Sequence, residues 1–129
     1  MNFELYDYVD AQDRNLFAQW TQGLEKPQRA KLNARLDLLQ QQGDGLLPEM
    51  LTGSPTPGIL KLRCRGNVQL RPLLCKGPID VDQEYTLLIG AIERSRKFDP
   101  AKADQTAAER KNAVLAAPTR RRCPHERIA

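Results

Sequence analysis

Four basic side chains at alternating positions are the residues of this sequence best suited to chemistry. Lys61, Arg63 and Arg65 precede the dipeptide Gly66-Asn67, and Arg71 follows it. Gly and Asn tolerate the positive φ of a tight turn, so the alternation on either side predicts a β-hairpin. Like charges gathered on one face of a sheet repel one another, so either carboxylates cover them or a polyanion binds there.

The register of this hairpin follows from its hydrophobic pattern. A three-residue loop at 66–68 pairs Arg63 with Arg71 and separates apolar from charged residues, whereas a two-residue loop would mix them on both faces. We therefore expect the three-residue loop. The apolar face then carries Leu60, Leu62, Cys64, Leu70, Pro72 and Leu74. The other face carries the four cations and Gln69, and we expect it to be open to solvent.

The composition is that of one globular domain. The chain has 129 residues, of which 40% are hydrophobic and 28% charged, and a formal net charge of +4. This positive charge favours an anionic partner such as nucleic acid. No apolar run approaches the roughly twenty residues of a membrane span, and Met1-Asn2-Phe3-Glu4 lacks the basic start and apolar core of a signal peptide. We expect a cytoplasmic protein with no membrane partner.

The cysteines predict neither a disulfide framework nor a metal site. Cys64 and Cys75 fall on opposite faces of the predicted hairpin, and we interpret all three cysteines as reduced thiols. Cys123 and His125 are two residues apart and could contact one metal ion, but a site needs three or four ligands and the others are not apparent. We expect no metal and no cofactor.

The elements that position the hairpin begin with a strand at residues 3–9, which alternate between apolar and polar. Apolar residues at helical spacing predict a helix over 13–24, and a second over 27–42 that begins at Pro27 and ends at Gly43. The spacing of Phe17 and Trp20 beside leucines is typical of core residues rather than of a base-stacking platform.

Beyond the hairpin, the continuous apolar run at 85–92 predicts a strand at the centre of the sheet. Asp99 followed by Pro100 predicts the N-cap and first residue of an alanine-rich helix that ends near Ala116. The chain is thus expected to form an α+β fold: a small antiparallel-rich sheet with an N-terminal helical hairpin on one face and a C-terminal helix. We predict a single domain over 1–117 and a flexible basic tail over 118–129.

Several of these segments together resemble the RelE/HigB toxin superfamily, and within it the phage-derived HigB-like branch. The resemblance covers about residues 3–116. It is carried by the helical hairpin with Trp20 and Leu24, by Leu60-Lys61-Leu62-Arg63, by Arg71, by Leu87-Leu88-Ile89-Gly90-Ala91-Ile92-Glu93-Arg94 and by the alanine-rich helix. It implies a RelE-like fold and the toxin of a type II toxin-antitoxin system, which inhibits translation by cutting mRNA on the ribosome. The implied partners are the ribosome, mRNA and a cognate antitoxin protein.

The activity implied by the resemblance is that of a metal-independent endoribonuclease. The RNA 2′-hydroxyl attacks the adjacent phosphate, and protein groups move the protons and stabilise the charge of the phosphorane. Lys61 and Arg71 would grip the scissile phosphate with Arg63 as a third group. The candidate catalytic residues are Lys61, Arg63, Arg71, Arg94 and His125. The candidate RNA-binding residues are Lys61, Arg63, Arg65, Arg71, Arg96 and Lys97.

The sequence also departs from the pattern of that superfamily. Leu70 and Leu74 stand where relatives often have an aromatic residue and a tyrosine. Ile89 or its neighbour replaces a histidine seen in many relatives, and Glu93 stands where lysine is frequent. An activity that relied on those groups would be absent. The alternative interpretation is a non-catalytic phage or prophage protein with the toxin fold that binds a host protein or nucleic acid, including poisoning of gyrase in the manner of ParE.

Overall fold

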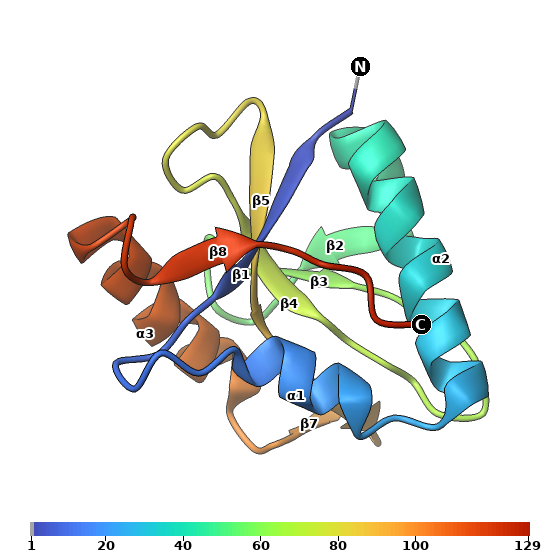
Figure 1. Ribbon diagram of the computed structural model, residues 1–129. Coiled ribbons are helices and arrows are strands. Elements are labelled where there is room, and N and C mark those ends of the chain that lie inside the picture. The colour runs from blue at the N-terminus through green and yellow to red at the C-terminus, as the bar shows by residue number, and fades with distance from the viewer. Residues whose placement is uncertain (1) are drawn as a thin grey trace.

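The computed structural model describes residues 2–129 and contains a six-stranded sheet between helices (Figure 1). The helices are α1 (Leu16–Gln22), α2 (Lys26–Gln42), the short 3-10 helix η1 (Gly43–Leu46) and α3 (Ala103–Ala116). The strands are β1 (Glu4–Tyr8), β2 (Leu51–Gly53), β3 (Leu60–Leu62), β4 (Leu73–Lys76), β5 (Glu84–Ile89), β6 (Ile92–Arg94), β7 (Lys97–Asp99) and β8 (Arg122–Pro124).

The large sheet has the strand order β2-β3-β4-β5-β1-β8. Only the β1/β5 pair is parallel, and the other four pairs are antiparallel. Every residue of β5 is buried, because strands flank it on both sides and helices cover both of its faces. The continuous apolar run therefore marks the centre of the sheet, as predicted. The α+β fold class is also confirmed.

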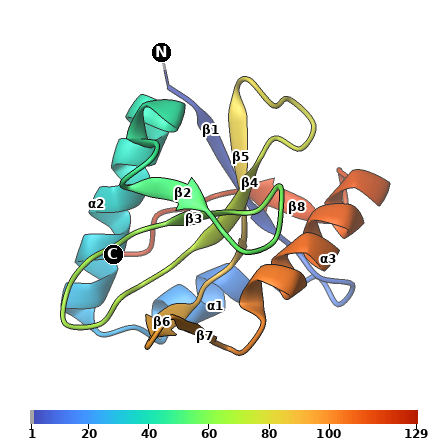
Figure 2. The same ribbon diagram turned by 180° about the vertical axis from the view of Figure 1, so that it is seen from behind.

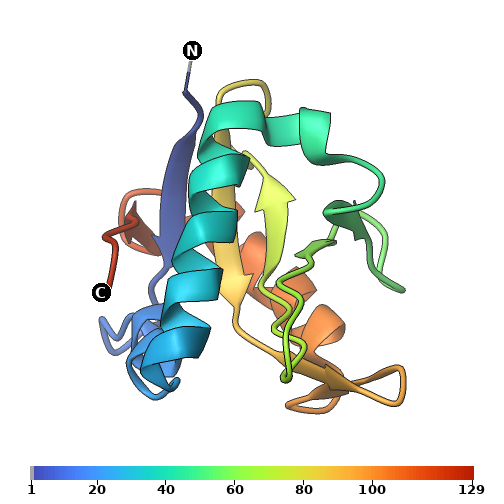
Figure 3. The same cartoon turned by 90° about the vertical axis from the view of Figure 1, so that its right-hand side faces the viewer.

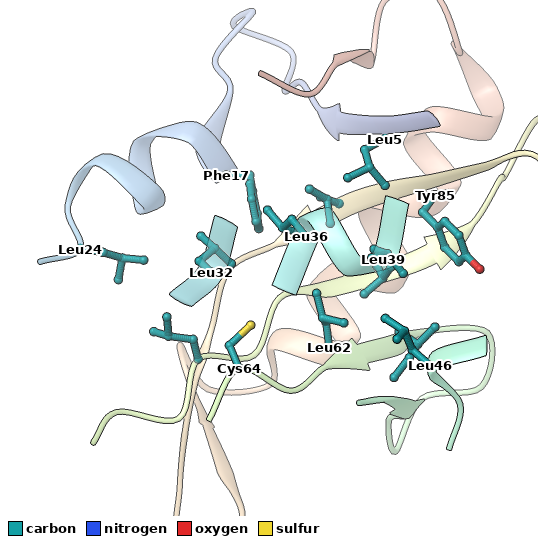
Figure 4. Packing of buried hydrophobic residues seen from close by; sticks show 14 residues of the cluster. Leu5, Phe17, Leu24, Leu32, Leu36, Leu39, Leu46, Leu62, Cys64 and Tyr85 are labelled. Atoms are coloured by element: carbon teal, nitrogen blue, oxygen red, sulfur yellow. The ribbon is translucent and has the colours of Figure 1, made fainter. Parts of the chain in front are cut away.

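One face of the sheet packs against α1 and α2. Leu32, Leu36 and Leu39 of α2 are almost fully buried and form one core with Phe17 of α1 and Leu62 of β3 (Figure 4). Seen from the side, α2 runs along this face while α3 lies behind the sheet (Figure 3). Phe17 and the partly buried Trp20 belong to this core, so the prediction that they are packing residues is confirmed.

The other face is covered by α3, so the predicted open face is wrong. Ala103 and Ala107 are fully buried and pack with Leu73 and Cys75 of β4 in a second core. Small alanine side chains let the helix backbone approach the sheet closely, which compensates for the lack of large apolar residues on α3. Of the hairpin cations, Lys61 lies toward this face, with its Nζ 5.6 Å from the centroid of the Phe98 ring.

The predicted register of the hairpin is confirmed. Leu60 pairs with Leu74, Cys64 pairs with Leu70, and the Leu62 amide donates to the Pro72 carbonyl at 2.9 Å, all consistent with Arg63 opposite Arg71. The regular strands are shorter than the alternation suggested. Cys64 and Cys75 lie in the two different cores, on opposite faces as expected. Burial raises the pKa of the Cys64 thiol to about 12 and that of Cys75 to about 11, so both stay protonated.

The strand predicted over 85–92 is interrupted at Gly90. A Cβ at this position would lie 2.0 Å from Cδ2 of Trp20, so only glycine lets the indole ring pack against the backbone here. The chain then forms the separate β6/β7 hairpin, which lies near the N-terminal end of α3 (Figure 2). Asp99 therefore belongs to β7, and α3 begins after Lys102 rather than at Pro100.

The segment 118–129, predicted to be a flexible tail, is part of the fold. Its strand β8 pairs with β1, with Asp7 opposite Cys123, and becomes an edge of the sheet. Asn33 of α2 donates a hydrogen bond to the Ile128 carbonyl at 2.7 Å, and Arg127 forms an ion pair with Asp37. Across the part of the chain that is described, no helix combines the length and the apolar character needed to cross a membrane.

Candidate functional site

Two of the predicted catalytic cations meet at one carboxylate. Arg71 Nε lies 2.8 Å from Glu93 Oε1, and Lys61 Nζ lies 3.2 Å from Glu93 Oε2. The exposed fractions of the three side chains are 9% for Arg71, 14% for Lys61 and 18% for Glu93. These three residues, called the Glu93 cluster below, lie near the surface and are incompletely covered.

Three chain segments bring the cluster together. Leu70 bridges to Cys64 on one side and to Ile92 on the other, so the segments around these residues run side by side. The Arg71 amide donates to the Ala91 carbonyl at 2.7 Å. Side chains alternate along such segments, so Arg71 and Glu93 project from the same face as Lys61. The cluster is thus positioned by the isolated bridges of Leu70 to Cys64 and to Ile92, which lie outside the regular strands β3 and β4.

Arg71 is held firmly in this arrangement. Besides the bond from Nε to Glu93, its Nη1 donates to the Leu70 carbonyl at 2.9 Å and its Nη2 donates to Gln69 Oε1 at 3.2 Å. All three guanidinium nitrogens therefore have acceptors within the protein. Lys61 is less constrained, because among residues 2–129 its ammonium group forms hydrogen bonds only with Glu93, and it lies 5.6 Å from the centroid of the Phe98 ring.

The charges of the cluster favour an ionised Glu93. Partial burial by itself raises the pKa of this carboxyl, but hydrogen bonds and charges from Arg71 and Lys61 outweigh burial and hold the pKa below its ordinary value. Near neutral pH the cluster consequently holds one carboxylate between two cations. Such a group can accept a proton from a substrate hydroxyl if a phosphate draws the cations away.

The other two cations of the predicted face lie elsewhere. Arg63 Nη1 donates to the Glu49 carbonyl at 3.3 Å, and both Arg63 and Arg65 line a hollow beside Arg35 of α2. The expectation of four cations on one exposed surface is therefore wrong. A carboxylate covers two of them, and the remaining two adjoin a helix that the sequence did not place near them.

The β6/β7 hairpin carries Arg94, Arg96 and Lys97, all of them exposed. Its turn residues Ser95 and Arg96 both have positive φ, at 50° and 64°, an arrangement that usually requires Gly or Asn. None of the three cations forms an ion pair with any residue between 2 and 129. The backbone amide of Glu93 donates a hydrogen bond to the Gln69 carbonyl, which fixes β6 beside the segment that carries Arg71. The three exposed cations of the hairpin therefore lie near the Glu93 cluster.

His125 does not join the cluster. It lies beyond β8 with its amide donating to the Leu5 carbonyl, on the face covered by α1 and α2, whereas Lys61 projects toward the face of α3. Its Nδ1 lies 2.9 Å from Asp7 Oδ1, and its ring packs against the edge of Phe17. The structure therefore separates His125 from the other candidate catalytic residues.

Asp7 is the centre of a second polar cluster that sequence reasoning missed. The side chain of Asn15 donates to Asp7 Oδ2 at 2.8 Å, and its carbonyl oxygen accepts from the Ala18 amide to cap α1. Cys123 Sγ lies 3.6 Å from the same Asn15 nitrogen. Burial, followed by the charge of Asp7, raises the pKa of the Cys123 thiol, which makes it a poor nucleophile. These contacts fasten the C-terminal segment to β1.

Glu93 was the other omission. From the sequence alone Glu93 stands out only as a departure from a lysine pattern, although a face of like charges calls for a nearby carboxylate. Within residues 2–129, no group of three or more His, Cys, Asp or Glu side chains is arranged to hold a metal ion.

Comparisons of the chain with models of known protein families, with curated proteins and with solved structures find no match.

Proposed function

We propose that this protein is a toxin of the RelE/HigB kind, a metal-independent endoribonuclease that cuts mRNA on the ribosome and so inhibits translation. The observation that carries the proposal is the Glu93 cluster, in which an ionised carboxylate contacts a lysine and an arginine near the surface. A proton acceptor beside two cations is the combination that cleavage of RNA by its own 2′-hydroxyl needs.

The proposed reaction assigns one role to each group of the cluster. An entering phosphate competes with Glu93 for Lys61 and Arg71, which frees the carboxylate and lets its pKa rise. Glu93 accepts the proton of the 2′-hydroxyl, and the 2′-oxygen attacks phosphorus. Arg71 stabilises the phosphorane charge. The bond from phosphorus to the 5′-oxygen breaks, and Lys61 protonates that oxygen, leaving a 2′,3′-cyclic phosphate and a 5′-hydroxyl.

The surrounding cations supply the proposed RNA contacts. Arg94, Arg96 and Lys97 are exposed on the hairpin that carries Glu93, and they can bind backbone phosphates on one side of the cluster. The proposed partners are the ribosome, mRNA and a cognate antitoxin, and the proposed location is the cytoplasm.

The test is controlled expression with mapping of mRNA ends, in cells that translate and in cells whose translation is blocked. Wild type should produce translation-dependent cuts, and Glu93→Gln and Lys61→Met should reduce them about 100-fold or more, because each removes a proton-transfer group. Glu109→Gln is the matched control, since Glu109 is an exposed carboxyl of α3 outside the cluster. Thermal unfolding checks that each variant folds. Cuts that persist at wild-type level in Glu93→Gln would remove the proposed mechanism.

A second function, binding without cleavage, is favoured by one specific observation. Every guanidinium nitrogen of Arg71 already has an acceptor inside the protein, and Glu93 has both cations in place. A network whose hydrogen-bonding groups all have partners within the protein can have a purely structural role. A host protein or nucleic acid would then be the target. Growth arrest with intact mRNA in the same experiment would support this second function and exclude the first.

A further inference from the structure

A groove runs along the exposed side of α2, on the face opposite the Glu93 cluster. It consists of three adjoining hollows between α2 and the chain segments at 49–50 and 63–70. Lys31 lines both the hollow at the N-terminal end of α2 and the middle hollow, while Arg35 and Arg65 line both the middle hollow and the one beside Met50, so neighbouring hollows share side chains. From Pro27 to Leu38 the helix rises about 17 Å at 1.5 Å per residue. Figure 2 shows the 63–71 segment running beside the N-terminal half of α2.

The middle of the groove is strongly positive. Its four cations are Lys31, Arg35, Arg63 and Arg65. None of them forms an ion pair with any described residue. The carboxylates that line the groove are those of Glu25 and Glu49, one toward each end.

This concentration of charge opposes folding. Lys31 and Arg35 are four residues apart on one helix face, a like-charge spacing that destabilises a helix. The ammonium of Lys31 also lies over the turn, so close that a Cβ on Gly66 would approach it at 2.6 Å. The positive centre is therefore maintained at some cost in stability, as a surface used for binding an anion would be.

The floor of the groove is aliphatic. Ala34, Leu38 and Cys64 line its middle, and Met50 lines one end with 40% of its surface exposed. No aromatic side chain lines any of the three hollows. Proteins that hold single-stranded nucleic acid usually stack its bases on aromatic rings, which this groove does not offer. An aliphatic floor with a cationic rim instead complements a polypeptide with aliphatic anchors and flanking carboxylates.

We propose that this groove binds an acidic, amphipathic segment of a partner polypeptide. Aliphatic side chains of the segment would contact Ala34, Leu38 and Met50, while its Asp and Glu residues would pair with Arg35, Arg63 and Arg65. Attraction between opposite charges would speed association and weaken with salt. This binding does not require RNA cleavage, so it stands or falls separately from the proposed enzymatic function.

The test is selection of random peptides of about twelve residues, long enough to span the groove in helical form, on the immobilised full-length protein. We expect the selected peptides to be enriched in Asp and Glu interspersed with Leu, Ile or Met. The double charge reversal Arg35→Glu with Arg65→Glu should weaken the best peptide about tenfold or more in fluorescence anisotropy. Lys102→Glu with Arg120→Glu is the matched control, because both residues are exposed outside the groove, and binding should remain at wild-type level.

A second variant separates loss of the site from loss of folding. Ala34→Glu changes an exposed helical residue at the floor, keeps good helix propensity, and should weaken the peptide similarly while thermal unfolding stays unchanged. A selection without acidic enrichment, or equal binding to the charge-reversed protein, would overturn the proposal. So would a uridine oligonucleotide that binds wild type but not the charge-reversed protein while no acidic peptide binds, since the groove would then be a nucleic acid surface.

Discussion

The Glu93 cluster and the Asp7–His125 pair are built from similar groups and differ in their surroundings. In each, a carboxylate on or beside a strand contacts an ionisable side chain from a distant part of the chain. Asp7 has 2% of its side chain exposed and holds Asn15, which caps α1, whereas 18% of the Glu93 side chain is exposed. Because the Asp7 carboxylate is the more deeply buried of the two, we expect the Asp7 pair to contribute more to the stability of the fold than the Glu93 cluster does.

The largest effect on stability should come from Asp7→Ala. This change leaves the partly buried nitrogens of Asn15 and His125 without their acceptor, so the free energy of unfolding should fall by about 3 kcal/mol. Urea unfolding of the purified protein measures it. The cap of α1 and the pairing of β8 should loosen together, which hydrogen exchange at Ala18 and His125 would detect. If Asp7→Ala lowered the free energy of unfolding by less than Glu93→Gln does, the distinction between the two regions would be contradicted.

Glu93→Gln should cost less stability, about 1 kcal/mol, because water can reach the cations that it leaves behind. Its effect should also depend on pH. The pKa of Glu93 in the folded protein lies below its ordinary value, so the carboxylate stabilises the fold above about pH 4 and this contribution is lost as pH falls through the folded-state pKa. The difference in unfolding free energy between wild type and Glu93→Gln should therefore be full at pH 7 and shrink in stronger acid. A difference that grows on acidification would reverse the assigned direction.

The smallest effect is expected for Arg127→Ala. The ion pair between Arg127 and Asp37 is exposed, with 58% and 47% of the two side chains accessible, and such pairs contribute less than about 0.5 kcal/mol. The C-terminal segment should stay in place through β8 and the Asn33 hydrogen bond to Ile128. Urea unfolding within error of wild type agrees with this ranking, whereas a loss comparable to that of Asp7→Ala would show that the segment depends on its surface contacts.

The spacing of apolar residues along the sequence predicted the hairpin register, the end of α2 and the central place of β5. The register of the hairpin followed from the separation of Leu60, Leu62 and Leu74 from the cations, because a shift of one residue would bury charge. The end of α2 at Gly43 and the central place of β5 followed in the same way. The need for glycine at position 90 could not be predicted, since the ring that occupies the space of a Cβ there belongs to Trp20, seventy positions earlier in the chain.

The candidate site was predictable only in part. The sequence indicated Lys61 and Arg71 and left open whether carboxylates or a polyanion would balance them, but the choice of Glu93 depends on how the chain folds back after β5. Strand β8 was missed because Arg122-Cys123-Pro124 has no apolar alternation, and it is held by hydrogen bonds to β1. For the same reason His125 was expected in a flexible tail and not beside Asp7.

Single-turnover cleavage on purified ribosomes distinguishes most directly between a reactive and a purely structural Glu93 cluster. Ribosomes programmed with an end-labelled mRNA receive wild type or Glu93→Gln, and a second mRNA carries one 2′-deoxynucleotide at the codon in the A site. The reaction proposed above predicts a fragment ending in a 2′,3′-cyclic phosphate, formed by wild type and lost with either change. Absence of any fragment with wild type, or undiminished cleavage by Glu93→Gln, would contradict it.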